Sequence, residues 1–461
     1  MTSIDQAPTS LQSVVADLAQ ANPVQGQLAY DLDRAHVFHS WSAQGALKPF
    51  TIAGALGSEV WDFDGKHYLD FSSQLVNMNI GHQHPKVVQA IRDQAGVLTM
   101  VAPAHANLAR GEAAKRILSK AGAGFGSVFF TNGGADAIEN AIRMTRLVTG
   151  RDKVLSTYRS YHGNTGSAIV ATGDWRRMPN EYATGHAHFF GPFAYRSEFW
   201  STSVEQEGER ALQHLKRTIQ AEGAATIAAI LLESVPGTAG VLVPPPGYLA
   251  GVRELCDEFG ILLILDEVMA GFGRTGEWFA WQADFGAGHS EARPDLIAFA
   301  KGVNSGYVPV GGVVISESIA SAFDTQVFPG GLTYSGHPLA AASIVASIDA
   351  MTDEGIIENA RMIGTDHLGP GLAELAAKHP LIGEVRGLGV FWALDLVSDP
   401  AQRTPVGPGV IAAIKAECMK RGLLPFAADN RIHVVPPCVI TPDEVARALA
   451  IYDEAFTAVE A

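Results

Sequence analysis

Aliphatic runs that alternate with amphipathic stretches limit the possible fold of this chain more than any other feature. Residues 261–265 (ILLIL) are almost purely aliphatic and lead directly into Asp266 and Glu267. That composition is typical of a strand buried on both faces of a parallel sheet. Further short strands are expected at 127–132, 153–158, 168–172, 226–234, 295–301 and 311–316, with helical patterns between most of them. The sequence therefore predicts an α/β fold whose central sheet is mostly parallel.

The domain organisation follows from the length of 461 residues, which is too long for one compact core. Residues 1–70 are expected to form an N-terminal arm and a β-hairpin that contribute to a small domain. A large domain is expected over 71–335. The pattern after 336 mixes antiparallel-type strands with helices, so 336–461 is expected to be the C-terminal small domain of α+β type.

Charge and cysteine content limit which macromolecules the protein can bind and where it is expected to be located. The formal net charge of −15 argues against nucleic acid or an anionic membrane as a partner. No apolar run approaches the length of a membrane span, and the first residues do not resemble a signal peptide. Three widely spaced cysteines suggest no disulfide framework. The expected location is the cytoplasm.

Two sequence patterns resemble functional motifs but are better explained as structural elements. Gly271, Gly273 and Gly276 match G-x-G-x-x-G, but the segment that follows lacks the helical period that a dinucleotide site needs. A glycine-bearing loop is the favoured interpretation, and a nucleotide-binding protein that uses this loop is the alternative. His82 and His84 have metal-like spacing without a supporting acid or cysteine cluster, so no metal site is expected.

Three features point together at one cofactor. Gly133 and Gly134 stand between a strand and a helix, where backbone N–H groups can bind a phosphate. Asp266 ends a buried strand and needs a cationic partner such as a pyridinium nitrogen. Lys301 follows an apolar strand, where desolvation would make its amine a nucleophile for an aldehyde. Taken separately, the three features could be an ordinary turn, an ion pair and a lysine that reaches solvent. Found together in this order along one sheet, the three features indicate pyridoxal phosphate.

Longer motifs resemble those of the class III aminotransferases, which belong to the fold-type I pyridoxal phosphate enzymes. The segment FTNGGADAIENAIRMTR resembles the family's phosphate-binding helix, and SYHG resembles its ring-stacking motif. LLILDEVMAGFGRTG and IAFAKGVNSGYVPVGG resemble its acidic-strand and lysine signatures. GLTYSGHPLAAA resembles the segment that reaches the phosphate of a neighbouring subunit.

The resemblance implies roles for individual residues. Lys301 would bond covalently to the cofactor and later move a proton, and Asp266 would pair with the ring nitrogen. Glu233 would lie near Asp266 on the floor of the site. The other residues implied in cofactor binding are Gly133, Gly134, Ala135, Tyr161, His162, Val268 and Thr333. Tyr161 and Val268 would flank the ring, and Thr333 would serve the neighbouring subunit, so a homodimer is the smallest competent unit and a tetramer stays open.

The phosphate segment departs from the family pattern. The family has Ser-Gly-Ser or Ser-Gly-Thr where this chain has Gly133, Gly134 and Ala135. Two hydroxyl groups are therefore missing, and backbone N–H groups, Thr333 or water must replace them.

The expected reaction moves an amino group from a primary amine or ω-amino acid, such as taurine or β-alanine, to pyruvate by a ping-pong cycle. The partners are then an amine donor and a 2-oxo acid acceptor. The alternatives are a 2-oxoglutarate-dependent ω-aminotransferase and a class III enzyme with a decarboxylating or isomerising outcome. Arg431, His433 and Arg386 are candidates for binding a carboxylate or sulfonate, although a structural role is favoured for Arg386. The candidate substrate residues are Trp41, Leu75, Val76, Phe426, Arg431 and His433.

Overall fold

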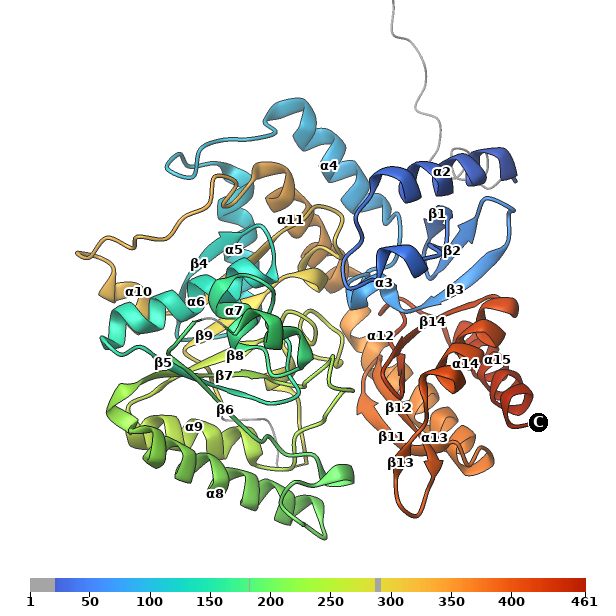
Figure 1. Cartoon of the computed structure of the whole chain (residues 1–461). Coiled ribbons are helices and arrows are strands. Elements are labelled where there is room, and N and C mark those ends of the chain that lie inside the picture. Colours follow the sequence, from blue (N-terminus) through green and yellow to red (C-terminus); the bar gives the residue numbers. More distant parts are fainter. Residues whose placement is uncertain (1–20, 182, 287–291) are drawn as a thin grey trace, which may run out of the picture.

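The computed structural model describes residues 21–181, 183–286 and 292–461 and contains two β-sheets (Figure 1). The first sheet has seven strands in the order β4-β10-β9-β8-β7-β5-β6. Their bounds are β4 Phe125–Thr131, β10 Gly311–Ser316, β9 Leu296–Phe299, β8 Leu262–Asp266, β7 Ile227–Glu233, β5 Lys153–Thr157 and β6 His186–Phe189. Strand β10 is antiparallel to both neighbours, and the pairs from β9 to β6 are parallel. The predicted α/β fold with a mostly parallel sheet is confirmed.

Helices cover both faces of this sheet because alternate strand residues point to opposite sides. Ile264 packs into one buried cluster with α6, whereas Leu263 and Leu265 pack into the other. The first face carries α6 (Gly134–Thr149), α7 (Gly166–Ala171) and α10 (Glu317–Ala322). The opposite face carries α5 (Leu108–Ala121), α8 (Val204–Glu222), α9 (Tyr248–Phe259) and α11 (Pro338–Asp353). Helix α4 (Pro85–Val97) packs against α11.

One expected strand is a helix. Ala168–Ala171 belong to α7, with Thr172 as its C-cap, and they are buried between α6 and the sheet. A short, wholly apolar run carries no period that separates a strand from a buried helix. The expectation was therefore wrong here because the burial pattern alone cannot distinguish the two structures.

The second sheet has the order β1-β2-β3-β14-β15-β12-β11, with β13 paired to β12. It joins β1 (Ile52–Leu56), β2 (Glu59–Asp62) and β3 (His67–Phe71) to strands from the other end of the chain. Those strands are β11 Ile382–Leu388, β12 Phe391–Asp399, β13 Thr404–Pro405, β14 Leu423–Ala428 and β15 Arg431–Val434. The predicted hairpin is the antiparallel pair β2–β3, and β3 runs parallel to β14, so blue and red segments lie side by side in Figure 1.

The remaining helices pack around this second sheet and at its junction with the first. They are α2 (Pro23–His36), α3 (Ser73–Val76), α12 (Ile356–Met362), α13 (Gly369–Lys378), α14 (Pro408–Lys420) and α15 (Pro442–Glu460). The first twenty residues of the expected arm lie outside the described part of the chain. Within that described part, no helix combines the length and apolar character needed to cross a bilayer.

Candidate active site

Three ionisable side chains meet at the carboxyl edge of the parallel sheet. The strand register places Glu233 of β7 beside Asp266 of β8, and Asp266 beside Ala298 of β9. Lys301 follows the end of β9 and has a φ of 41°, which is unusual for a residue with a side chain. Ligands of open α/β sheets bind outside this edge, and strained backbone is common at such sites. The topology therefore brings the predicted lysine and both predicted carboxylates together.

Asp266 is buried and held on both carboxylate oxygens. His162 Nδ1 lies 2.8 Å from Oδ2, and the Val268 backbone N–H donates to Oδ1 at 3.0 Å. His162 Nε2 is buried and has no hydrogen-bond partner in the described residues. A buried carboxylate fixed in this way is a suitable partner for a protonated ring nitrogen.

Lys301 has an amine that is easier to deprotonate than an ordinary lysine. Burial lowers the pKa of Lys301 to about 8, with smaller opposing effects from Asp266 and Glu233. A substantial neutral fraction at mildly alkaline pH makes the amine a nucleophile. Burial also raises the pKa of Glu233 above its usual range, and its carboxylate accepts hydrogen bonds from the Tyr161 and Gly237 N–H groups at 3.0 and 2.8 Å.

The adjacent carboxylate, Glu267, has a different environment from Asp266. It accepts hydrogen bonds from the Ser234 hydroxyl and from the N–H groups of Ala280 and Trp281, the latter two at 2.8 and 2.9 Å. Burial raises the pKa of Glu267 to about 7. Glu267 therefore ties the loop after β8 to the sheet, while Asp266 lies beside His162.

The start of helix α6 leaves space for an anion. Gly133 caps the helix without a side-chain hydrogen bond, and a Cβ atom added to it would meet nothing within 4 Å. A Cβ on Gly134 would lie 2.9 Å from Val268 Cγ1, and Ala135 packs against Gly163. Free backbone N–H groups at a helix start attract a phosphate. The residues present thus fit the phosphate and the ring nitrogen of pyridoxal phosphate.

A cavity of about 510 Å³ opens above Lys301. Tyr161 forms part of its wall, with the Trp41 ring edge-on at 6.5 Å between centroids. Four of the predicted substrate residues line this cavity, namely Trp41, Leu75, Phe426 and Arg431.

Three other predicted residues lie away from this cavity. Val76 and His433 are each 1% exposed and do not line it. His433 packs against the Phe426 ring, and burial lowers the pKa of His433 to about 3, so its imidazole is neutral. Thr333 is exposed and is also outside the cavity lining.

Several wall residues were missed by sequence reasoning. They are Arg159, Ser160, Asp174, Trp175, Arg176, Phe193, Arg196, Thr238, Ala239, Met269, Pro405, Ala428, Asp429 and Asn430. Most lie on loops or short 3₁₀ turns, where no periodic pattern marks burial. The cluster of tryptophan and arginine at 175–177 in a segment without periodicity is the one signal that could have drawn attention to them.

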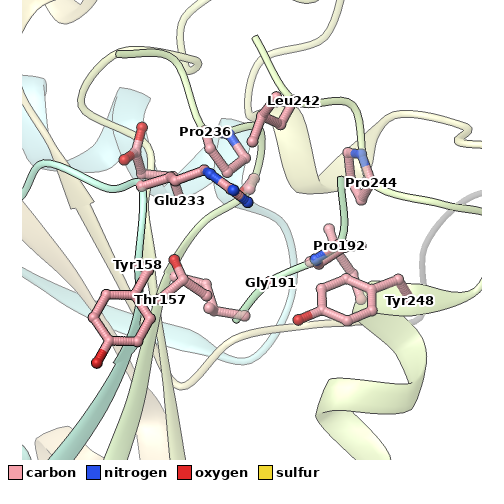
Figure 2. A pocket seen from close by; sticks show the side chains of 13 residues that line it. Thr157, Tyr158, Gly191, Pro192, Glu233, Pro236, Leu242, Pro244 and Tyr248 are labelled. Atoms are coloured by element: carbon pink, nitrogen blue, oxygen red, sulfur yellow. The ribbon is translucent and has the colours of Figure 1, made fainter. Parts of the chain in front are cut away.

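A second cavity, of about 30 Å³, lies behind Glu233 between β7 and α9 (Figure 2). Its wall includes Pro192, Pro236, Pro244 and Tyr248, and Figure 2 shows the Glu233 carboxylate pointing away from Pro244 and Tyr248. That volume holds roughly one or two water molecules. This second cavity is therefore too small for an organic substrate.

The motif-like patterns have structural roles in the described chain. The glycine-bearing segment 271–276 forms turns and leads to the short 3₁₀ helix Ala280–Gln282, so it does not open a nucleotide-binding helix. His82 and His84 hydrogen-bond Asp70 and Glu354 at 2.9 and 3.1 Å. Arg386 donates to the Gly240 carbonyl at 2.6 Å and pairs with Glu384, which supports its structural interpretation.

Comparisons with known proteins agree with this geometry. The family model for class III aminotransferases matches residues 42–456. The chain is 31% identical to the taurine–pyruvate aminotransferase of Bilophila wadsworthia, with 93% of this chain and 97% of the relative covered. It is 34% identical to the putrescine–pyruvate aminotransferase of Pseudomonas aeruginosa, with 86% and 87% covered.

Solved structures give the same result. The taurine:2-oxoglutarate aminotransferase of Bifidobacterium kashiwanohense, in complex with pyridoxal phosphate and glutamate, is 41% identical with a TM-score of 0.90, and 94% of this chain and 98% of that chain are covered. An (S)-enantioselective ω-transaminase from Thermomicrobium roseum is 34% identical with a TM-score of 0.87, at 94% and 98% coverage. The chain therefore belongs to the class III aminotransferases and is a pyridoxal phosphate-dependent enzyme of fold-type I.

Proposed function

We propose that the enzyme moves an amino group from a primary amine or ω-amino acid, such as taurine or β-alanine, to pyruvate by a ping-pong cycle. The observation that carries this proposal is the desolvated Lys301 amine at the floor of a 510 Å³ cavity, beside Asp266. The cavity has room for a short donor and for a small oxo acid in turn. The taurine–pyruvate and putrescine–pyruvate activities of the relatives named above support the branch.

The roles that we propose at the reacting centre follow from position. Pyridoxal phosphate supplies an aldehyde for the amino group and a ring that takes up electrons from the donor carbon. Lys301 holds the cofactor and then transfers the proton at the donor carbon. Asp266 holds the ring nitrogen protonated, and His162 fixes the Asp266 carboxylate. Glu233 orients the Tyr161 backbone through its hydrogen bond.

Around the cofactor we assign Tyr161 and Val268 to the two ring faces. Gly133, Gly134 and Ala135 bind the phosphate through the start of α6, supported by the open space at Gly133. Thr333 serves the phosphate of a second subunit, so the active unit is a homodimer. The exposed position of Thr333 outside its own cavity is compatible with that assignment.

The arrangement of domains and the location complete the proposal. A small domain combines the part of 1–70 that follows the undescribed residues with 336–461, supported by the β3–β14 pairing, and 71–335 form the large domain. Helix α11, at the start of 336–461, packs on the first sheet and joins the two domains. The free, buried Cys256, Cys418 and Cys438 support a cytoplasmic location.

A panel of donors with two acceptors tests the reaction. We expect taurine, β-alanine or a simple primary amine to yield alanine from pyruvate in the holoenzyme. Formation of carbon dioxide or an isomer, with no net amino transfer, would support the decarboxylating or isomerising alternative instead.

A second acceptor is favoured by one observation. The 41% identical relative is a taurine:2-oxoglutarate aminotransferase by name, which supports 2-oxoglutarate as the alternative acceptor. Glutamate formation from 2-oxoglutarate without alanine formation from pyruvate would establish this alternative and would refute the pyruvate proposal.

A further inference from the structure

The cavity above Lys301 is cationic although the chain as a whole carries a net charge of −15. Five cationic side chains line it, against two carboxylates. The cations are Arg159, Arg176, Arg196, Lys301 and Arg431, and the carboxylates are Asp174 and Asp429. A local excess of positive charge with apolar walls favours a small anion over a neutral ligand.

Each of the four arginines pairs with a carboxylate of the protein itself, but the donors that stay unpaired differ. Arg196 donates to both carboxylate oxygens of Asp395, at 2.8 and 2.7 Å, and to the Arg403 carbonyl. Arg431 donates to Asp429 and to the Thr238 carbonyl, and its Nε is buried without a partner. The Arg431 Nε is therefore closed off from the cavity, whereas its Nη1 makes no hydrogen bond within the described residues and is not buried.

Arg176 is held differently. Asp174 accepts hydrogen bonds from its Nε at 3.1 and 3.0 Å and from Nη2, whereas no hydrogen bond within the described residues engages Nη1. The guanidinium carbon Cζ lies over the Tyr161 ring, 3.7 Å from its centroid, and the side chain is 17% exposed. Asp174 and the Tyr161 ring together fix the orientation of the guanidinium, so Nη1 is already positioned before a ligand binds.

Arg176 also acts on the Lys301 amine, whereas Arg159 is not among the charges that shift the pKa of Lys301. The positive charge of Arg176 contributes to lowering the pKa of Lys301. Arg159 pairs with Glu198 and lies over the Phe193 ring. Tyr161, which Arg176 covers, and Lys301 line the same cavity.

We propose that Arg176 binds the carboxylate or sulfonate of an ω-amino acid donor through Nη1, and that Asp174 is the positioning residue that orients it. The inference rests on the proposed aminotransferase function and names the substrate class of that site. It assigns the anionic group to Arg176 in place of Arg431, His433 and Arg386, the three candidates from the sequence. The donor that fits has a primary amine directed to Lys301 and an anionic head group directed to Arg176.

The first experiment compares two donors of similar size in the donor half-reaction of the holoenzyme, without any oxo acid. β-Alanine carries the anion, whereas propylamine replaces the carboxylate with a methyl group. We expect R176M to lower the ratio of the single-turnover rate constant to the apparent Kd for β-alanine about 10- to 100-fold relative to propylamine, mainly through Kd, because a charge-assisted hydrogen bond is lost. R176K, which keeps the charge without the forked geometry, should give an intermediate ratio.

The neighbouring Arg177 provides the matched control. It lies on the same 3₁₀ turn, stacks on Tyr158 and does not line the cavity. R177M should therefore leave the donor ratio within about threefold of the unmodified enzyme. An unchanged ratio in R176M, or an equal change in R177M, would overturn the inference.

Anion binding gives a readout that does not need an amino donor. Propionate should raise the melting temperature of the unmodified holoenzyme, and R176M should lose most of that shift. The same shift in both proteins would contradict the role of Arg176. If the unmodified enzyme transferred no amino group from any donor tested, the proposed function would fail. The propionate measurement would still decide whether Arg176 binds anions.

Discussion

The residues at the strand ends and those on the loop wall of the same cavity are positioned by different structural features. Asp266, Glu233 and Lys301 are set by the register of adjacent parallel strands, so their proximity follows from the sheet. Asp174 and Arg176 lie on a loop and a 3₁₀ turn, and their geometry depends on each other and on Tyr161. We assign the chemistry of the reaction to the first group and recognition of the donor's anionic group to the second.

The largest expected effect concerns the strand-end group. Lys301→Ala should lower turnover by about 10⁴-fold or more, because one amine both holds the cofactor and moves the proton. Reduction of the unmodified holoenzyme with borohydride and peptide mapping should place the label on Lys301. A label on another lysine, or full activity of the variant, would remove Lys301 from the proposed mechanism.

The adjacent carboxylates provide a smaller but more discriminating test. Asp266→Asn should lower turnover about 100-fold, because the charge that keeps the ring nitrogen protonated is lost. Glu267→Gln should leave turnover within a few-fold and lower the free energy of unfolding by about 1–2 kcal/mol, because its hydrogen-bond network is altered. Steady-state kinetics and chemical denaturation measure the two effects, and equal losses of turnover would contradict the division of roles.

The pH dependence of cofactor attachment tests the environment of Lys301. The pKa of Lys301 is lowered to about 8, so the reactive neutral amine is the minor form below that pH. The rate constant for attachment of pyridoxal phosphate to the apoenzyme should rise about tenfold per pH unit up to about pH 8 and then level off. A rise that continues toward pH 10 would indicate an ordinary, solvated lysine.

The smallest expected effect compares two glycines at the start of α6. Gly133→Ser should fit, because its Cβ meets open space, and its hydroxyl should tighten phosphate binding by roughly threefold to tenfold. Gly134→Ala should weaken cofactor binding, because its Cβ would crowd the Val268 side chain. Equilibrium titration of both apoenzymes with cofactor measures the difference, and tighter binding by Gly134→Ala would contradict this packing.

The parallel sheet, its acidic strand end and the lysine after β9 could be predicted from the sequence, because buried strands have a strong compositional signal. The helix at 166–171 could not, because a short apolar run fits either structure. Arg176 was missed because its position depends on side-chain contacts with Tyr161 and Asp174 across a loop that has no periodic pattern. Val76 and His433 were expected at the cavity because residue type and position in the sequence do not show which side chains are buried.

The parallel pairing of β3 with β14 has a consequence for biosynthesis. Leu69 pairs with Leu423, so strand β3 leaves the ribosome long before its neighbour is made. Until then, β3 has an open edge that can pair with other nascent chains. A polypeptide that stops before residue 423 keeps that edge exposed, so premature termination late in the message should yield aggregates even when every reacting residue has been translated.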